Sequence, residues 1–229
     1  MLKGVIFDMD GVLIDSHPAH LCAWRMFLCE LGLNVSDRDL EIVLDGRKRQ
    51  EILKHFLGEL TEEQIVHHSR RKEEHFNGCA DQVRPFPEVV PFLEILSASG
   101  ILMAVATSAS RPRAQATLER FNLKRYFTAL ATGNDVVHGK PHPAIFQLAA
   151  SHLKLSPENV IAIDDAFSGV RAARAAGMRC IGMGSGDHAE TLRAAGAHVV
   201  RENFAGLRIP ELLGLFSDRA ISAGASAYT

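Results

Sequence analysis

The sequence predicts an α/β fold in which a parallel β-sheet is covered by helices on both faces. Three observations lead to this prediction: apolar runs of strand length, helical patterns between them, and a block of helices that interrupts the alternation. Strands without polar alternation are typical of a sheet that is buried on both sides. We therefore expect a doubly wound, Rossmann-like sheet with a small α-helical domain inserted into it.

Five apolar runs of strand length are candidates for the strands of this sheet, and a shorter run at 129–131 is a candidate for a sixth. The five lie at residues 5–7, 101–106, 160–163, 180–183 and 198–200. Helical patterns fall between them, at 89–99, 113–121, 144–153, 169–176 and 189–195. Gly100, Gly177 and Gly196 follow three of these helices, where a residue in the left-handed conformation commonly ends a helix. The alternation indicates parallel strands joined by helical crossovers.

Residues 16–83 break the alternation because they contain helical patterns only. The candidate helices lie at 18–31, 37–44, 49–57 and 61–77. The last of them opens on Thr61-Glu62-Glu63-Gln64, which has the pattern of a capping box. We expect an α/β core made of residues 1–15 and 84–229, and a helical cap made of residues 16–83. The tail at 220–229 is rich in small residues and indicates no role.

The composition excludes several classes of protein. Of the 229 residues 47% are hydrophobic and 23% charged, which is typical of a folded domain with a sizeable core. The 25 basic and 27 acidic residues give no basic excess that would favour a nucleic-acid partner. No apolar run reaches the roughly 20 residues of a membrane-spanning helix. The four cysteines form no C-x-x-C pair and the first strand leaves no room for a signal peptide, so we expect a cytoplasmic protein.

Polar side chains follow the strands of the predicted sheet, at the edge where parallel strands end together. They are Asp8 and Asp10 after the first strand, Thr107 and Ser108 after the second, Asp164 and Asp165 after the run at 160–163, and Lys140 in a Gly-Lys-Pro loop. Carboxylates this close repel one another, and a divalent cation with oxygen ligands, most simply Mg²⁺, would offset that repulsion. Hydroxyls, loop amides and a lysine suit a phosphate group. The sequence therefore predicts a site for Mg²⁺ and a phosphate at this edge.

Four segments resemble the motifs of the haloacid dehalogenase superfamily. They are D-x-D-G-x-x-x-D-S at 8–16, a threonine at position 107, G-K-P-x-P at 139–143 and IAIDDAFSGVRAARAAGM at 161–178. Their order, their spacing and the helical insertion after the first motif are similar to those of the β-phosphoglucomutase-like phosphatases in that superfamily. The resemblance covers nearly the whole chain up to about residue 200, and it implies a haloacid dehalogenase-type core with a helical cap.

The resemblance also implies a Mg²⁺-dependent phosphohydrolase that acts through an aspartyl-phosphate. Asp8 would be the nucleophile, and Asp10 would protonate the leaving oxygen and then activate water. Thr107 and Lys140 would complete the catalytic set. The cation would be held by Asp8, Asp10 and Asp165, with Asp164 close by. The phosphoryl oxygens would be bound by Gly11, Thr107, Ser108 and Lys140.

Substrate selection is expected to depend on the cap and on the loop after the second strand. The candidate residues for this role are His20, Gly46, Arg49, Lys72 and Arg111. For His20 a packing role is an equal alternative, because it lies among apolar residues on an amphipathic helix.

Two enzymatic activities stay open on these residues. A phosphatase of small phosphorylated metabolites, above all sugar phosphates, releases the phosphoryl group to water, whereas a phosphomutase transfers it to another sugar hydroxyl. His20, Arg49 and Lys72 favour the mutase. Ala109 and Arg111 favour the phosphatase, because the mutases have a serine and an asparagine at these positions for a distal phosphate. The phosphatase is our first prediction, and the phosphomutase is the alternative.

A third class, a binding protein without catalysis, is disfavoured because both Asp8 and Asp10 are present. The partner expected from the sequence is a small phosphorylated metabolite, with neither a nucleic acid nor a membrane. We expect the protein to be a monomer.

Overall fold

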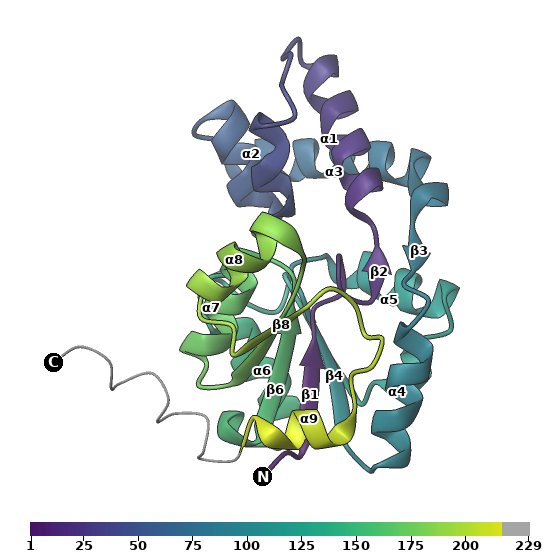
Figure 1. Ribbon diagram of the computed structural model, residues 1–229. Helices are drawn as coiled ribbons and strands as arrows, with labels where there is room; N and C mark the ends of the chain where they lie inside the picture. The colour runs from purple at the N-terminus through teal and green to yellow at the C-terminus, as the bar shows by residue number, and fades with distance from the viewer. Residues whose placement is uncertain (217–229) are drawn as a thin grey trace, which may run out of the picture.

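Six parallel strands form the central sheet of the computed structural model, which describes residues 1–216 (Figure 1). In the order β5-β4-β1-β6-β7-β8 the sheet contains Ala129–Thr132, Leu102–Thr107, Gly4–Phe7, Val160–Asp164, Arg179–Met183 and Val199–Arg201. In this register Phe7 lies between Val105 of β4 and Ile163 of β6. The α/β fold class predicted from the sequence is confirmed.

Strand β1 lies at the point where the direction of winding changes. From β1 the chain continues to β4 and β5 on one side, and then to β6, β7 and β8 on the other. Ligands of open α/β sheets bind beyond the carboxyl ends of the strands at such a point. The ends of β1, β4 and β6 are therefore where a functional site is expected.

Side chains of each strand alternate between two buried faces of the sheet. Val5 and Phe7 pack against one group of helices, and Ile6 packs against the other. The first group consists of α4 (Val89–Ala98), α5 (Arg111–Arg120) and α9 (Ile209–Gly214). The second consists of α6 (Ala144–His152), α7 (Phe167–Ala175) and α8 (Gly186–Ala194). Both faces are covered, which explains why the strands are apolar without alternation.

Residues 17–82, between β1 and β4, are mainly helical and lie above the carboxyl edge of the sheet (Figure 1). It contains α1 (His17–Glu30), α2 (Arg49–Leu57), α3 (Glu62–Gly78) and the 3₁₀ helices η1 (Asp39–Leu44) and η2 (Ala80–Gln82). These helices have an apolar cluster of their own around Trp24, Phe27 and Leu53. The capping box is present, since Thr61 and Gln64 exchange hydrogen bonds of 2.9 and 3.2 Å. The cap boundaries at 16 and 83 stay a prediction.

Two short strands connect the cap to the core. β2 (Ile14–Asp15) pairs antiparallel with β3 (Arg84–Pro85), so the outgoing and returning chains are hydrogen-bonded side by side. The sequence did not predict this pairing, because two residues are too few to show a strand pattern. The ribbon fixes where the cap meets the core.

Several helices begin earlier than the apolar pattern suggested. α5 begins at Arg111 rather than 113, α7 at Phe167 rather than 169, and α8 at Gly186 rather than 189. Apolar periodicity locates the buried part of a helix, whereas the first turn is often polar, and a proline such as Pro112 is tolerated there. Helix α9 and the 3₁₀ turns η3 (Lys124–Tyr126) and η4 (Pro157–Asn159) were not predicted.

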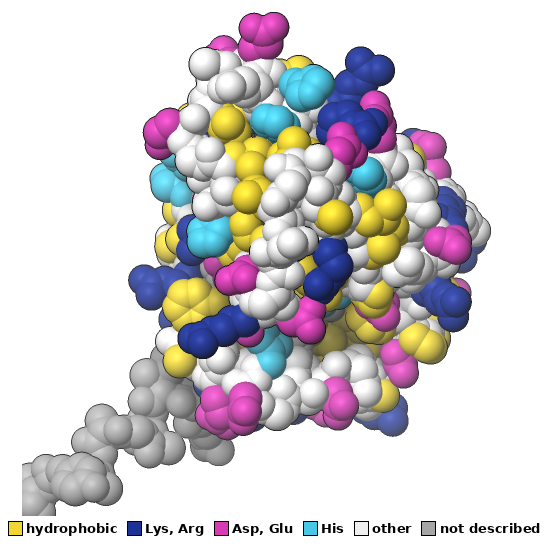
Figure 2. All heavy atoms as spheres, turned by 90° about the horizontal axis from the view of Figure 1, so that it is seen from above, with side chains coloured by type: hydrophobic (Ala, Val, Ile, Leu, Met, Phe, Trp, Pro, Cys, Tyr) yellow, Lys and Arg dark blue, Asp and Glu magenta, His cyan; other side chains and the backbone are white. Residues whose placement is uncertain are grey.

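The predicted left-handed positions at Gly100, Gly177 and Gly196 are confirmed, with φ of 68°, 82° and 105°. Within residues 1–216 there is no helix that combines the length and the apolar character needed to cross a membrane. On the face seen in Figure 2, lysine and arginine side chains are scattered among acidic ones. The small-residue tail at 220–229 lies outside the described residues.

Candidate active site

A cavity of about 80 Å³ lies between the carboxyl edge of the sheet and the cap. From the core it is lined by the expected residues Asp8, Asp10, Thr107, Ser108 and Asp165, and by Ala109 and Arg113. From the cap it is lined by His20, Gly46, Arg49 and Lys72, together with His17, Trp24 and Arg47. The fold thus brings together residues that are up to 157 positions apart in the sequence, from Asp8 to Asp165.

Asp8 follows β1 directly, and its position is fixed by its backbone. Its amide donates to the carbonyl of Ile163 at 2.8 Å, so the ladder with β6 continues into the site. Its carboxylate accepts a hydrogen bond from Lys140, whose Nζ also donates to Asp164 at 2.7 Å. Lys140 is fully buried; burial opposes its charge, but Asp164 and Asp8 raise the pKa of Lys140. This lysine therefore remains a cation between two carboxylates.

Asp165 faces the cavity, whereas Asp164 faces away from it. The carboxylate of Asp165 lies 3.1 Å from Nε2 of His17. Asp164 accepts from Lys140 and from the amide of Ala166 at 2.9 Å, and its side chain is fully buried. Asp164 thus orients Lys140 and the loop after β6, while Asp165 is available to a ligand in the cavity.

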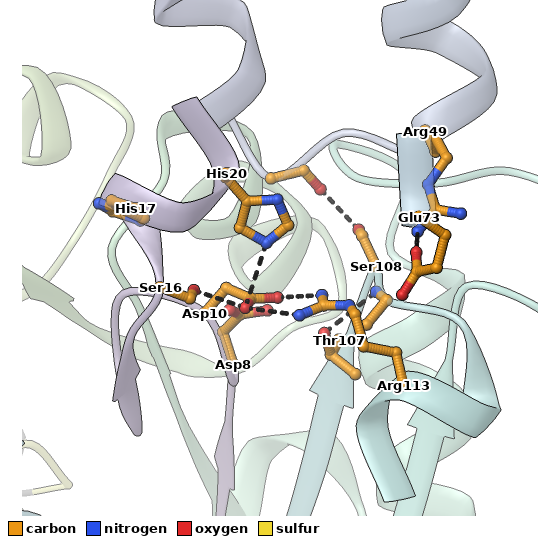
Figure 3. Close-up of polar contacts among 12 residues, drawn as sticks. Asp8, Asp10, Ser16, His17, His20, Arg49, Glu73, Thr107, Ser108 and Arg113 are labelled. Atoms are coloured by element: carbon orange, nitrogen blue, oxygen red, sulfur yellow. Dashed lines mark hydrogen bonds and ion pairs between the residues drawn. The ribbon is translucent and has the colours of Figure 1, made fainter. Parts of the chain in front are cut away.

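Asp10 has three polar neighbours that the sequence did not all reveal (Figure 3). Its carboxylate accepts from both terminal nitrogens of Arg113 and, at 2.6 Å, from the hydroxyl of Ser16. Nε2 of His20 lies 3.5 Å away. Burial alone would raise the pKa of Asp10, but the ion pair with Arg113 lowers it well below the usual range. In this arrangement Asp10 is a carboxylate, the form that a general base requires.

The two hydroxyls after β4 are held by different partners. Thr107 is buried, and its Oγ1 accepts from the amide of Ala109 at 3.1 Å. The hydroxyl of Ser108 donates to the carbonyl of Gly46 at 2.6 Å, which joins the core loop to the cap (Figure 3). Both residues line the cavity as expected for phosphoryl binding.

The cap contributes basic side chains that are largely withdrawn from water. Nζ of Lys72 is 3.1 Å from Nδ1 of His20, and Lys72 is almost completely buried. Burial, together with the neighbouring charge of Lys72, lowers the pKa of His20 to about 3, so its ring is neutral. Arg49 forms an ion pair with Glu73. His20, for which packing was an equal alternative, packs against Phe76 with the ring centroids 4.6 Å apart, and it also lines the cavity.

Arg113, and not the expected Arg111, is the arginine of α5 that lines the cavity. Arg111 pairs with Asp135 at 2.6 Å and is not among the residues that line the cavity, whereas Arg113 lines it and binds Asp10. Residues two positions apart on a helix point in nearly opposite directions. If the sequence had indicated that α5 starts at Arg111, it would have shown that Arg111 and Arg113 point to opposite sides of this helix. His17 was also missed, because nothing in its sequence neighbourhood indicates an acidic partner.

The acidic residues suit a cation that shares its ligands with a substrate. Within residues 1–216 no group of three or more His, Cys, Asp and Glu side chains is arranged to hold a metal ion. Mg²⁺ commonly takes only one or two carboxylates and completes its shell with phosphate, carbonyl and water oxygens. Burial raises the pKa of Asp8, and Asp164, Asp165 and Asp10 add to this although Lys140 opposes it. A cation between Asp8 and Asp165 would relieve that crowding.

The comparisons with known proteins agree with this geometry. The family described as haloacid dehalogenase-like hydrolase matches residues 2–177 of the chain. The phosphorylated carbohydrates phosphatase of Thermotoga maritima is 32% identical over 192 residues, 79% of this chain and 84% of that protein. The fructose-1-phosphate phosphatase of Escherichia coli is 33% identical over 180 residues, 78% of this chain and 94% of that protein. The structure of β-phosphoglucomutase from Clostridium difficile superposes with a TM-score of 0.85 at 25% identity, covering 94% of this chain and 97% of that chain.

Proposed function

Because this chain belongs to the haloacid dehalogenase-like hydrolase family, we propose that it is a Mg²⁺-dependent phosphatase of small phosphorylated metabolites, and of sugar phosphates in particular. The observation that carries the proposal is that Asp8 and Asp10 line one small cavity, with Lys140 bound to Asp8. Relatives named as phosphatases of phosphorylated carbohydrates and of fructose 1-phosphate support the choice of substrate class.

The residues of the core divide the reaction between them. An oxygen of Asp8 forms a bond to phosphorus while the ester bond breaks, and the leaving oxygen takes a proton from Asp10. Asp10 is a carboxylate in this structure, so this step requires that it gains a proton in the complex with substrate. Water then attacks the phosphorus of phospho-Asp8 and gives a proton to the carboxylate of Asp10, which releases Asp8. The hydroxyl of Thr107 and the backbone amide of Ser108 donate to the phosphoryl oxygens, because the hydroxyl of Ser108 is engaged with Gly46, and Lys140 stabilises the charge of Asp8. Bound Mg²⁺, held by Asp8, Asp165 and the backbone of Asp10, would offset repulsion between carboxylate and phosphate.

A phosphomutase is the second candidate, favoured by the basic cap residues that line the cavity. His20, Arg49 and Lys72 all reach the site from the cap, where a second phosphate would have to be held. The core loop offers less to such a group: Ala109 lines the cavity without a hydroxyl, and the hydroxyl of Ser108 is bound to Gly46. We therefore place the phosphatase first.

The experiment that separates these activities supplies β-glucose 1-phosphate with a sugar bisphosphate primer and Mg²⁺. We expect mainly inorganic phosphate and little glucose 6-phosphate, and we expect EDTA to stop the release and Mg²⁺ to restore it. Predominant formation of glucose 6-phosphate would establish the mutase instead. A screen of phosphorylated sugars under the same conditions then identifies the preferred substrate.

The first prediction concerns the nucleophile. Asp8→Asn should abolish turnover, because an amide does not attack phosphorus, whereas Asp187→Asn at an exposed position of α8 should leave it unchanged. Phosphate release measures turnover, and mass spectrometry of the acid-quenched wild type should show a phosphorylated peptide that contains Asp8. Full activity of the Asp8→Asn protein would place the chemistry on another residue.

A further inference from the structure

Two cysteines that are far apart in the sequence lie side by side in the cap. Cys22 is in the second turn of α1, and Cys79 directly follows α3. Their Sγ atoms are 2.9 Å apart, although 57 positions separate the two residues, and both are free thiols. A disulfide bond has an S–S distance of about 2.0 Å, so the sulfur atoms need to approach by only roughly 1 Å to form one.

The other two cysteines have no such neighbour. Cys29 is exposed on α1, seven positions after Cys22. Residues seven apart on an α-helix are separated by about 10 Å along its axis, whereas a disulfide joins Cα atoms within roughly 7 Å. Cys180 is fully buried in β7 and packs on the opposite face of the sheet from Cys79. The fold therefore selects one pair of cysteines out of four.

The two thiols of this pair differ in their access to solvent. Cys22 is half-buried, whereas Cys79 is 4% exposed and packs in the apolar cluster that contains Ala23 and Phe76. The thiol of Cys79 donates to the sulfur of Cys22, and burial together with this hydrogen bond raises the pKa of Cys79 to about 11. Cys79 is therefore a protonated thiol, and Cys22 is the sulfur that an oxidant in solution reaches first.

We propose that Cys22 and Cys79 form a redox site, at which reaction with a small disulfide compound links α1 covalently to the end of α3. The thiolate of Cys22 attacks one sulfur of the compound, and the other sulfur leaves as a thiolate that takes up a proton. Cys79 then loses its proton and attacks the Cys22 sulfur, and the second half of the compound leaves as a thiol. Two protein thiols are oxidised to one disulfide, and the small disulfide is reduced to two thiols.

The new bond closes a loop that contains most of the cap. The chain between Cys22 and Cys79 includes η1, α2 and α3, and a cross-link over so long a loop strongly restricts the unfolded chain. The bond also fixes α1 against α3, the helices from which His20 and Lys72 reach the cavity. Oxidation therefore stabilises the folded cap, and an excess of small thiols reverses it.

The Cys29→Ser protein is the parent for the test, because its exposed thiol has been removed and takes up no glutathione. It is incubated with oxidised glutathione, unfolded and alkylated. We expect two fewer alkylated cysteines than in the reduced protein, and a peptide pair joined through Cys22 and Cys79. Oxidised glutathione is the reagent rather than peroxide, because peroxide also oxidises exposed methionines such as Met26, whose Sδ is 3.8 Å from Cys22.

The stabilisation is measured on the same samples. The melting temperature of the oxidised parent should exceed that of the reduced parent by about 5 °C or more, and dithiothreitol should abolish the difference. This comparison uses one protein in two redox states, so it does not depend on a substitution that alters folding.

Two further substitutions in this parent separate the steps of the reaction. With Cys79→Ser the reaction should stop at a mixed disulfide between glutathione and Cys22. With Cys22→Ser no glutathione should be taken up, because the remaining Cys79 is buried. Neither variant should melt at a higher temperature after oxidation. When reduced, Cys22→Ser should melt within about 2 °C of the parent, since the position is half-buried, which shows that it folds.

Three results overturn the inference. The first is that the oxidised parent keeps both thiols free, or carries glutathione on Cys22 while Cys79 stays free. The second is a cross-link that includes Cys180, because such a bond forms only in an unfolded chain. The third is a bond between Cys22 and Cys79 without a rise in the melting temperature, because the bond then does not stabilise the folded cap. None of these readouts depends on phosphatase activity, so the inference and the proposed function can fail separately.

Discussion

The backbone of Gly11 is confined by the carboxylate of Asp165, which we propose as a ligand of the cation. Gly11 has φ of 77°, a conformation in which a side chain is strained. A Cβ atom there would lie 2.0 Å from Oδ2 of Asp165 and 2.5 Å from Nε2 of His17. The glycine after the D-x-D pair is therefore required by contact with Asp165 as well as by its turn.

Gly11→Ala should displace Asp165 and lower activity by about tenfold or more, with a matching loss of Mg²⁺ affinity. Gly32→Ala is the matched control, because Gly32 has φ of 76° but no heavy atom within 4 Å of the added carbon. Both variants share the backbone strain of about 1 kcal/mol, so only the contact differs. Titration of activity with Mg²⁺ measures the effect, and equal activities of the two alanine variants would refute the role of the contact.

His20 makes stability depend on pH, since its ring is held neutral by burial and by Lys72. Its pKa is about 3 in the folded protein and about 6.5 in an unfolded chain. Below pH 6.5 the unfolded chain binds a proton that the folded protein does not, so stability falls as the pH is lowered from 6.5 toward 3. This amounts to about 2 kcal/mol between pH 7 and pH 5.

His20→Gln should remove that part of the acid sensitivity, and His67→Gln on the exposed face of α3 should not. The measurement is the free energy of unfolding in urea at pH 7 and pH 5 for the three proteins. The pH dependence that comes from His17 has the opposite sign. Burial opposes the charge of the His17 ring, but the hydrogen bond and charge of Asp165 raise its pKa. The stability that protonated His17 contributes is therefore lost as the pH rises above about 6.5. An unchanged pH dependence in His20→Gln would show that its ring is not held neutral.

At the scale of elements, the strands and helices were predictable where burial is regular. All six strands of the sheet were found from apolar runs, because a strand covered on both faces carries no competing polar pattern. The resemblance of the four motifs to the haloacid dehalogenase superfamily is confirmed by the family match. The motifs could be found from the sequence because each of them is a short continuous segment. The β2–β3 ribbon was not predictable, because it depends on where the two chain segments between core and cap lie in space. The ion pair of Arg113 with Asp10 was not predictable, because it depends on where α5 lies relative to β1.

Strand β1 supplies the prediction at this scale. Phe7 is fully buried and lies 5.9–6.3 Å from the rings of Phe92, Phe127 and Phe204, measured between centroids. Phe7→Ala should lower the free energy of unfolding by about 3–5 kcal/mol, the usual cost of a large cavity. Phe167→Ala, at a phenylalanine that is 36% exposed on α7, should cost about 1 kcal/mol or less. Equal losses in urea unfolding would show that the cluster around Phe7 is not the centre of the core.

At the scale of the whole molecule, the loop at residues 45–48 holds the cap on the core through hydrogen bonds. The carbonyl of Gly46 accepts from Ser108, and the carboxylate and carbonyl of Asp45 accept from the amide and hydroxyl of Ser168. These contacts close the cavity over Asp8, and closure excludes water from the reacting groups. The same loop then continues to Lys48, which reaches across to the core.

Lys48 tests whether closure limits activity. Its Nζ donates to the carbonyls of Val136 and Val137 at 2.9 and 3.3 Å, and neither bond is part of the catalytic set. Lys48→Met removes both hydrogen bonds and should make the free energy of cap closure less favourable by about 1 kcal/mol. The effect is no larger because Lys48 is only half-buried. That cost corresponds to a fall in kcat/KM of roughly fivefold.

The control is Lys54→Met, whose Nζ pairs with Glu59 inside the cap at 3.0 Å and makes no bond to the core. Both variants lose one charge from the same region, so only the bond between cap and core differs. In Lys48→Met, backbone amides at residues 45–48 should exchange with deuterium faster, while the free energy of global unfolding changes little. A fall in kcat/KM without faster exchange would mean that Lys48 acts on the substrate directly. Faster deuterium exchange at residues 45–48 with an unchanged kcat/KM would mean that cap closure does not limit kcat/KM.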